Sequence, residues 1–435
     1  MRSQGSLAGR GPSWERFSGL LVLALWGIAR AVQVKYLGTG VGFDVGLYQQ
    51  YAHQFGSGAG AYVDFQPEYP PGALPVFLLP LLWGGAVGYA KAFAAEMACF
   101  DLAACLLVFF TSRLGAPRGS VRPWLACGLY IAITAALFPV LYTRFDLVPG
   151  TLVLAAIYCF RMRRPGWAGV FLGIAGCVKL WPFALVPLFA AWEIKRKGFR
   201  HAVAAGLWVG VGAIVAALPL LPRAELGVFS FLKYHAARGI QLETTWATVA
   251  LILNRIGIAN VQPEHNFGAF HVAGRLPAVF ATLSMPLTIL FALAPQVVAI
   301  VRRLRQGEER ERAFEHAAFA SVLGFMIAGK VLSPQFMLWI APLLPLAAEG
   351  PAGAFFALMV GALTTAVYPY LSPALEQREP GHGWALLALG GRNLLLIGWY
   401  CAFFFRALGP LKLGRWSLAR AHRLSAATPS QHGNL

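Results

Sequence analysis

The sequence is poor in charged residues. Asp, Glu, Lys and Arg make up 12% of its 435 residues, whereas soluble domains carry about a quarter. Hydrophobic residues reach 58%, and the mean hydropathy is +0.61. Several stretches of about 20 residues have almost no charge, which is enough to cross a hydrocarbon core about 30 Å thick. The scarcity of charge excludes an ordinary soluble protein and predicts an all-α, polytopic membrane protein.

Several motifs that carry chemistry are also missing. The six cysteines lie in apolar runs without CxxC spacing, so the sequence predicts neither a disulfide framework nor a zinc site. Neither GxGxxG nor a complete Walker pattern is present to bind a nucleotide. The first apolar run, 17–34, lacks a small-residue cleavage site. It is therefore expected to be a retained span and not a signal peptide.

The net charge of +18 does not indicate nucleic-acid binding, because the basic residues are clustered between apolar runs. Positively charged loops stay on the cytoplasmic side of a membrane. Both termini and these loops are therefore predicted to be cytoplasmic. The largest clusters are RMRR (161–164), KRKGFR (195–200), RRLRQGEERER (302–312) and the tail from Lys412 to Arg423.

Alternation between these clusters predicts the order of crossings. Full spans are expected at 17–36, 87–112, 123–142, 147–160, 202–221, 276–301, 352–371 and 384–408. An outer loop at 38–86 follows the first span. Within it, the proline-containing stretch 73–83 is too short to span and is expected to lie at the outer surface. Residues 1–408 are predicted to form one transmembrane domain, and 409–435 a disordered basic tail.

Two segments are too short for a pair of full spans. Only 30 residues, 165–194, separate two basic clusters that both belong inside, and their centre holds Lys179 and Pro182. The segment 312–349 repeats the pattern with Lys330 and Pro334. Each is predicted to be a hairpin of broken helices with its lysine at the tip, which requires a protein-lined cavity. The total is about 10–12 helices.

Ionisable residues at membrane depth are costly and usually functional. The predicted topology places most of them at or facing the outer side: Asp44, Asp64, Glu68, Arg144, Asp146, Lys179, Lys233, His235, Arg238, Glu243 and Lys330. Cations can stabilise charge that develops on a phosphate, and a carboxylate can accept a proton from an attacking hydroxyl. These residues alone do not decide which acid acts as base.

Structural roles are open for several of these residues. Arg144 and Asp146 could form an interfacial ion pair, and Glu96 and Asp101 could be paired packing residues within a span. Lys330 could extend its amine to the interface, and Lys179 and His235 could be structural. The prolines of EYPPG, 68–72, are expected to stiffen the outer loop.

Six motifs occur in a characteristic order: GFDVGLYQQYA (42–52), EYPPGALPVF (68–77), RFDLVPG (144–150), VKLWP (178–182), RGIQLE (238–243) and GKVLSPQF (329–336). With their hydrophobic spacing, they make the chain resemble the bacterial membrane glycosyltransferases of family 87, which have the GT-C fold. The resemblance extends over residues 15–408. It implies a GT-C-like bundle with a catalytic first outer loop in a multi-pass protein of the bacterial plasma membrane.

The resemblance also implies an activity. Such enzymes transfer a sugar, often mannose, from a polyprenyl-phosphate donor to a lipid or glycan acceptor on the extracytoplasmic face. The acid just after the first span acts as base, which here is Asp44, in an inverting single displacement. This mechanism requires no metal or other cofactor, although Asp44, Asp64 and Glu68 could hold a metal ion. The expected substrate-binding residues are Asp64, Glu68, Tyr69, Arg144, Asp146, Lys179, His235, Arg238, Gln241, Glu243, Lys330 and Gln335.

Two other classes compete with this interpretation. Broken helices in two similar segments are typical of transporters, so a flippase of lipid-linked sugars is the main alternative. A transporter needs its site near the midplane, however, whereas these charges cluster toward one side. A membrane scaffold is the third class. It would not require Asp44, Arg144, Lys179 and Lys330 to converge.

Overall fold

The computed structural model describes residues 17–38, 42–220, 226–302, 308–348, 350–377 and 382–408. Within these residues, six helices are long and apolar enough to cross a membrane: α2 (Ser18–Leu37), α6 (Tyr89–Arg113), α12 (Phe199–Ala217), α15 (Arg275–Val301), the helix that starts with α19 (Gly350–Thr365), and α21 (His382–Leu408). The prediction of an all-α polytopic membrane protein is confirmed. The predicted basic tail, 409–435, lies outside the described residues.

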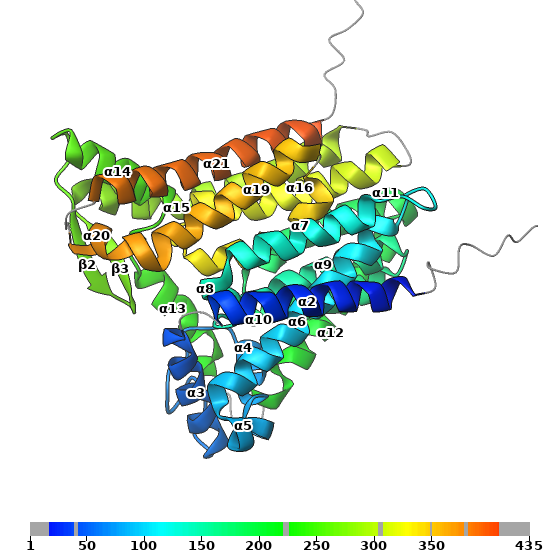
Figure 1. The fold of residues 1–435 in the computed structure, drawn as a ribbon, viewed down its shortest axis with the longest axis horizontal. Helices are drawn as coiled ribbons and strands as arrows, with labels where there is room; N and C mark the ends of the chain where they lie inside the picture. The colour runs from blue at the N-terminus through cyan, green and yellow to red at the C-terminus, as the bar shows by residue number, and fades with distance from the viewer. Residues whose placement is uncertain are drawn as a thin grey trace, which may run out of the picture.

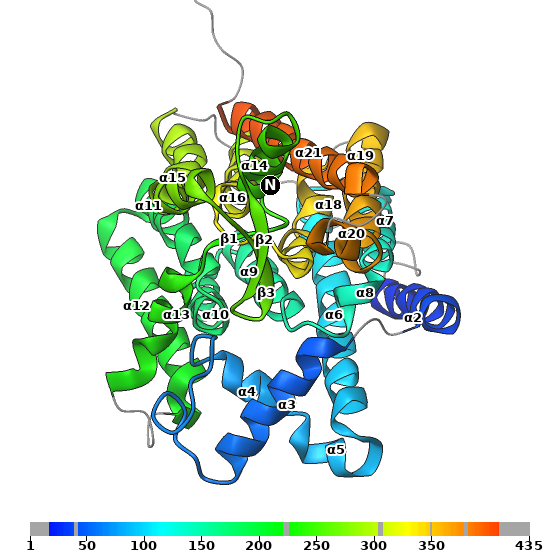
Figure 2. The ribbon, with the colours of Figure 1, turned by 90° about the vertical axis from the view of Figure 1, so that its left-hand side faces the viewer.

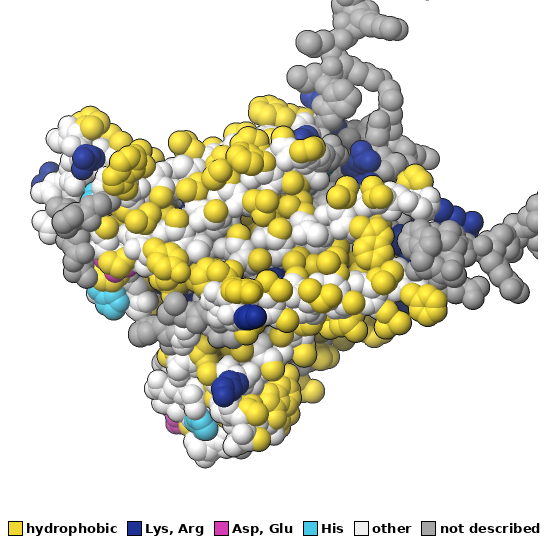
Figure 3. Space-filling view, viewed as in Figure 1, with side chains coloured by type: hydrophobic (Ala, Val, Ile, Leu, Met, Phe, Trp, Pro, Cys, Tyr) yellow, Lys and Arg dark blue, Asp and Glu magenta, His cyan; other side chains and the backbone are white. Residues whose placement is uncertain are grey.

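The long helices run side by side in one bundle (Figure 1). The first turn of α2 and the last turn of α21 lie at the same end of it. On the face seen in Figure 3, apolar side chains are exposed along the length of the bundle. Other helices complete the bundle: α7 (Arg122–Ala136), α8 (Phe138–Leu141), α9 (Leu147–Arg161), α10 (Pro165–Val178) and α16 (Glu308–Ala328).

Small residues let α10 approach α12 closely. A Cβ atom at Gly173 would lie 2.0 Å from the carbonyl oxygen of Val209, and one at Gly212 would lie 2.1 Å from that of Val170. No side chain fits at either position. Such glycine contacts are common between membrane helices, where packing and not water drives association.

Both predicted hairpins are broken at their lysines. Helix α10 ends at Val178, Lys179 is extended (φ −155°, ψ 138°), and a 3₁₀ turn, Trp181–Leu185, leads into α11 (Val186–Lys197). In the second hairpin, α16 ends at Ala328. A 3₁₀ turn (Pro334–Phe336), α17 (Met337–Ile340) and α18 (Leu344–Ala347) follow the non-helical stretch around Lys330. Proline at the start of each 3₁₀ turn explains why the helix does not continue through it.

The end of the bundle opposite the first turn of α2 carries additional elements (Figures 1 and 2). The predicted outer loop forms α3 (Phe43–Gly56), α4 (Ala73–Leu78) and α5 (Leu81–Val87). Between α12 and α15 lie α13 (Ser230–Ala237), α14 (Thr245–Arg255) and three short strands: β1 (Ile240–Gln241), β2 (Gln262–Asn266) and β3 (Ala269–Ala273). The strands form an antiparallel sheet in the order β1-β3-β2, which the helical prediction did not include.

A bend after α19 brings the C-terminal part of the chain to the same end. A π-helical turn (Ala366–Leu371) contains a cis peptide bond between Tyr368 and Pro369, and α20 (Ser372–Gln377) follows. Figure 2 shows α20 beside the sheet at this end of the bundle. Tyr368 is thereby placed near the elements that carry the predicted site.

Candidate functional site

The centre of the candidate site is an ion pair between Arg144 and Asp44. Arg144 Nε lies 2.9 Å from Asp44 Oδ2, and the side chains are 5% and 25% exposed. Arg144 also donates to the Tyr368 hydroxyl (3.1 Å) and to the Thr143 carbonyl (3.1 Å). Asp44 is in the first turn of α3, so its carboxylate is anchored at a helix end while part of it stays open to solvent.

The surroundings of Asp44 are electrostatically mixed. Burial raises the pKa of its carboxyl, and the Arg144 guanidinium opposes that rise. The carboxylates of Glu68 and Asp146 raise this pKa further, while Lys179 lowers it. Four ionisable residues from three of the motifs therefore act on one carboxylate. A raised pKa brings a carboxylate closer to the proton affinity that a general base needs.

Asp146 holds Lys179 in a fixed position. Its Oδ1 accepts hydrogen bonds from Lys179 Nζ (2.5 Å) and Trp339 Nε1 (2.6 Å). Aromatic rings surround the amine, with centroids 4.8 Å away for Phe145 and 5.3 Å away for both Phe336 and Trp339. Asp146 is 1% exposed, whereas Lys179 is 17% exposed. The buried Asp146 carboxylate therefore fixes the position of Lys179, while the Lys179 side chain stays partly exposed at the site.

The outer loop is tied directly to the first helix break. The amide of Gly72 donates to the Cys177 carbonyl at 2.9 Å, two residues before Lys179. Tyr69 packs its ring on Phe145, with centroids 4.9 Å apart. Asp64 is exposed and accepts a hydrogen bond from the Gly60 amide within its own loop (2.7 Å). The loop therefore places Tyr69 beside Lys179, whereas Asp64 shapes the loop itself.

A second group of cations comes from α13 and the second break. Lys330 Nζ donates to the Ala236 carbonyl (2.8 Å), and the Arg238 guanidinium lies over the Tyr234 ring (5.7 Å). In the described part of the chain, neither cation has an ion-pair partner. Burial and Arg238 lower the pKa of His235 to about 4, while Glu68 opposes this shift. His235 is therefore uncharged at neutral pH.

The remaining predicted residues frame the site. Gln241 joins β1 to the second break: its amide nitrogen donates to Ser333 Oγ (2.9 Å), and its side-chain oxygen accepts from the Leu332 amide (3.0 Å). Glu243 pairs with Arg392 at 2.6 Å. Gln335 is half-buried in the 3₁₀ turn after Lys330. Substrate binding by these three residues stays a prediction.

The sequence reasoning missed three residues that contact the site. Tyr368 bonds to Arg144, Trp339 bonds to Asp146, and Arg392 neutralises Glu243. Arg392 could have been found from sequence, because it is an ionisable residue inside a predicted span. Tyr368 and Trp339 carried no such signal. Among the described residues, no three His, Cys, Asp or Glu side chains gather to hold a metal ion.

Comparison with known proteins identifies one related family. Residues 68–334 match the family model described as Glycosyltransferase family 87. The matched range contains EYPPG, Arg144, both lysine breaks and the sheet. Asp44 and Tyr368 lie outside it. No match to a curated protein was found.

Proposed function

Because the chain belongs to glycosyltransferase family 87, we propose that it transfers a sugar, mannose in the first instance, from a polyprenyl-phosphate donor to a hydroxyl of a lipid or glycan acceptor. The observation that carries this proposal is the Asp44–Arg144 pair. It holds a partly exposed carboxylate among cations that come from distant parts of the chain. A proton acceptor beside positive charge is what this reaction requires.

In the proposed mechanism, Asp44 is the general base of a single inverting displacement. Arg144 occupies Oδ2, so Oδ1 is the oxygen that can receive the proton. The acceptor oxygen forms a bond to the anomeric carbon while the bond from that carbon to the phosphate oxygen breaks. The hydroxyl proton passes to Asp44, and polyprenyl phosphate leaves with the electron pair. These steps use no metal or other cofactor.

The leaving phosphate needs cations that are not already neutralised. Arg144 and Lys179 each have a carboxylate partner within 3 Å. Arg238 and Lys330 have no ion-pair partner in the described residues, so we assign the phosphate chiefly to them. Uncharged His235 can add a hydrogen bond. Lys179 stabilises the negative charge of the phosphate electrostatically, from the position that Asp146 fixes.

We further propose that the site faces the extracytoplasmic side of a bacterial plasma membrane, with both termini cytoplasmic. The support is the distribution of basic clusters between apolar helices. Single cysteines at two exposed positions, Val63 and Lys197, test it. Cysteine at Val63 should react with an impermeant thiol reagent on intact cells, and cysteine at Lys197 only after permeabilisation. The reverse pattern would place the site in the cytoplasm.

The activity is tested with membranes that contain the protein and labelled polyprenyl-phosphate mannose or polyprenyl-phosphate arabinose. The label that moves into a new product identifies the donor. Asp44→Asn should reduce transfer by at least about 10²-fold, because the amide cannot accept the proton. Asp64→Asn is the matched control and should have a milder effect. Label that crosses the membrane without forming product would instead support the flippase class.

A further inference from the structure

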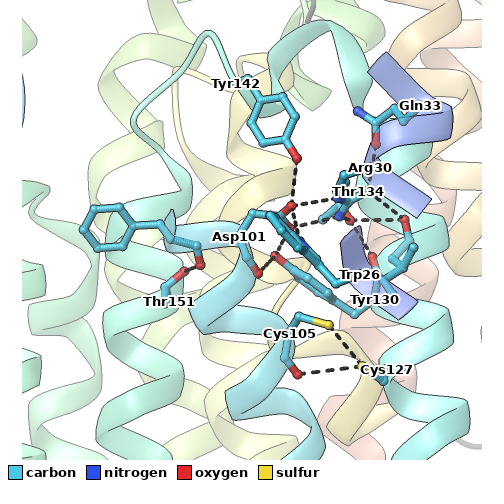
Figure 4. Close-up of polar contacts among 12 residues, drawn as sticks. Trp26, Arg30, Gln33, Asp101, Cys105, Cys127, Tyr130, Thr134, Tyr142 and Thr151 are labelled. Carbon is cyan, nitrogen blue, oxygen red and sulfur yellow. Dashed lines mark hydrogen bonds and ion pairs between the residues drawn. The ribbon is translucent and has the colours of Figure 1, made fainter. Parts of the chain in front are cut away.

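A buried polar cluster lies between α2, α6 and α7 and includes Tyr142, which follows α8 (Figure 4). Its centre is Asp101 in the middle of α6, which is 0% exposed. Oδ2 accepts from Arg30 Nε (2.7 Å), Trp26 Nε1 (2.7 Å) and the Tyr142 hydroxyl (2.9 Å). Oδ1 accepts from Arg30 Nη2 (2.9 Å) and the Tyr130 hydroxyl (2.8 Å). Five donor groups from three parts of the chain therefore converge on one carboxylate.

This cluster is not suited to bind a ligand or move a proton. Both carboxylate oxygens are occupied, and the paired cation is itself 5% exposed. A paired and fully hydrogen-bonded charge at membrane depth avoids the large cost of an isolated one. A purely structural lock between α2, α6 and α7 would need only Arg30, Trp26 and Tyr130. Tyr142 is the donor that such a lock does not explain.

Tyr142 begins the segment 142–146, which connects α8 to α9 and is buried throughout. Alternate residues of this segment contact three different parts of the protein. Tyr142 bonds to Asp101, Arg144 pairs with Asp44, and Asp146 holds Lys179. Thr143 adds a bond from Oγ1 to the Pro139 carbonyl (2.9 Å). The segment therefore links the buried cluster to both ion pairs of the site.

We propose that Asp101 is a positioning residue for the transfer reaction. Through its bond to Tyr142 it fixes the position of the segment 142–146, and thereby the positions of the Asp44 and Lys179 side chains. The catalytic part of this inference rests on the proposed function. The claim that Asp101 fixes the position of the segment is independent of the proposed function. Small displacements matter because a shift of about 1 Å in a reacting group can cost about 10²-fold in rate.

The matched test compares Tyr142→Phe with Tyr130→Phe. Each removes one hydroxyl from the same carboxylate and leaves an isosteric ring, but only Tyr142 belongs to the segment. Both variants should lower the melting temperature by similar amounts. Tyr142→Phe should lower kcat by at least about tenfold with the donor KM changed less than about threefold. Tyr130→Phe should keep kcat within about twofold of wild type.

Hydrogen exchange provides a readout that needs no sugar. Amides of 142–150 should exchange faster in Tyr142→Phe and at the wild-type rate in Tyr130→Phe. If Tyr142→Phe cannot be purified folded, Thr143→Val loosens the same segment and must give the same pattern. Equal effects of the two Tyr→Phe variants on kcat and exchange, or wild-type kcat in Tyr142→Phe, would overturn the proposal. A wild-type protein without transferase activity would refute the proposed function, and exchange would still decide whether Asp101 holds the segment.

Discussion

The contact between Gly72 and the first helix break predicts the effect of a single methyl group. Gly72 has helical backbone angles (φ −69°, ψ −7°), so alanine is compatible with its conformation. A Cβ atom there would lie 2.7 Å from the carbonyl carbon of Cys177 and 2.9 Å from the backbone nitrogen of Val178. Ordinary van der Waals contact begins at about 3.4 Å. Because both neighbours are backbone, the loop and the break must separate by about 0.7 Å.

That separation acts on the site because Glu68 and Tyr69 are on one side of the contact and Lys179 on the other. A shift approaching 1 Å can cost about 10²-fold in rate, so we expect Gly72→Ala to lower kcat by about 10- to 100-fold. The variant should also be less stable. Loss of the Gly72–Cys177 hydrogen bond costs about 1 kcal/mol and overpacking costs about 1–3 kcal/mol. Initial rates with labelled donor and a melting curve in detergent measure the two effects.

Gly46→Ala is the control for this prediction. Gly46 lies in α3 two residues after Asp44, and nothing lies within 4 Å of a Cβ built there. The variant should transfer sugar at the wild-type rate and be no less stable, since alanine favours a helix. Wild-type kcat in Gly72→Ala, or an equal loss in Gly46→Ala, would refute the argument from this contact.

Three further predictions concern the ion pairs. Arg144→Met removes the cation that opposes the raised pKa of Asp44, so this pKa should rise further. Activity is lost as the pH falls through the pKa of the base. The acid limb of the kcat/KM profile should therefore lie at a higher pH in Arg144→Met than in the wild type. An acid limb that does not move would exclude Asp44 as base. Lys179→Met should weaken donor use and lower the melting temperature, and adding Asp146→Asn should restore the melting temperature but not donor use. Arg392→Met leaves the Glu243 carboxylate buried without a cation and should destabilise by about 3–5 kcal/mol, measured by denaturant unfolding; a loss below 1 kcal/mol would contradict this.

The helix breaks could be predicted from sequence because they follow from length. Thirty residues between two basic clusters that are both expected on the same side cannot contain two full spans, and a proline three or four residues after a lysine marks where the helix stops. The structure breaks the chain at Lys179 and around Lys330, as expected. The sheet could not be predicted in the same way. Its strands have two to five residues, and their alternation is too short to be distinguished from a loop.

The sequence also indicated which residues gather at the site, but not how they pair. Asp44, Arg144, Asp146 and Lys179 lie close enough to act electrostatically on one another, whereas the sequence left open a pair between Arg144 and Asp146. In the structure each of these two residues has a partner from another motif. Pairing depends on which backbone segments face each other across the bundle. Local patterns do not contain that information.

Exposure separates the acid suited to chemistry from those suited to structure. Asp101, Asp146 and Glu243 are each paired with a cation at 2.5–2.7 Å, and their side chains are 0%, 1% and 10% exposed. Water and substrate are largely excluded from these carboxylates, and their bonds hold neighbouring segments together. Asp44 has the same kind of partner, but its side chain is 25% exposed. A general base must reach an incoming hydroxyl at about 2.6–3.2 Å while its position is held from behind. Of these four paired acids, Asp44 meets both conditions best.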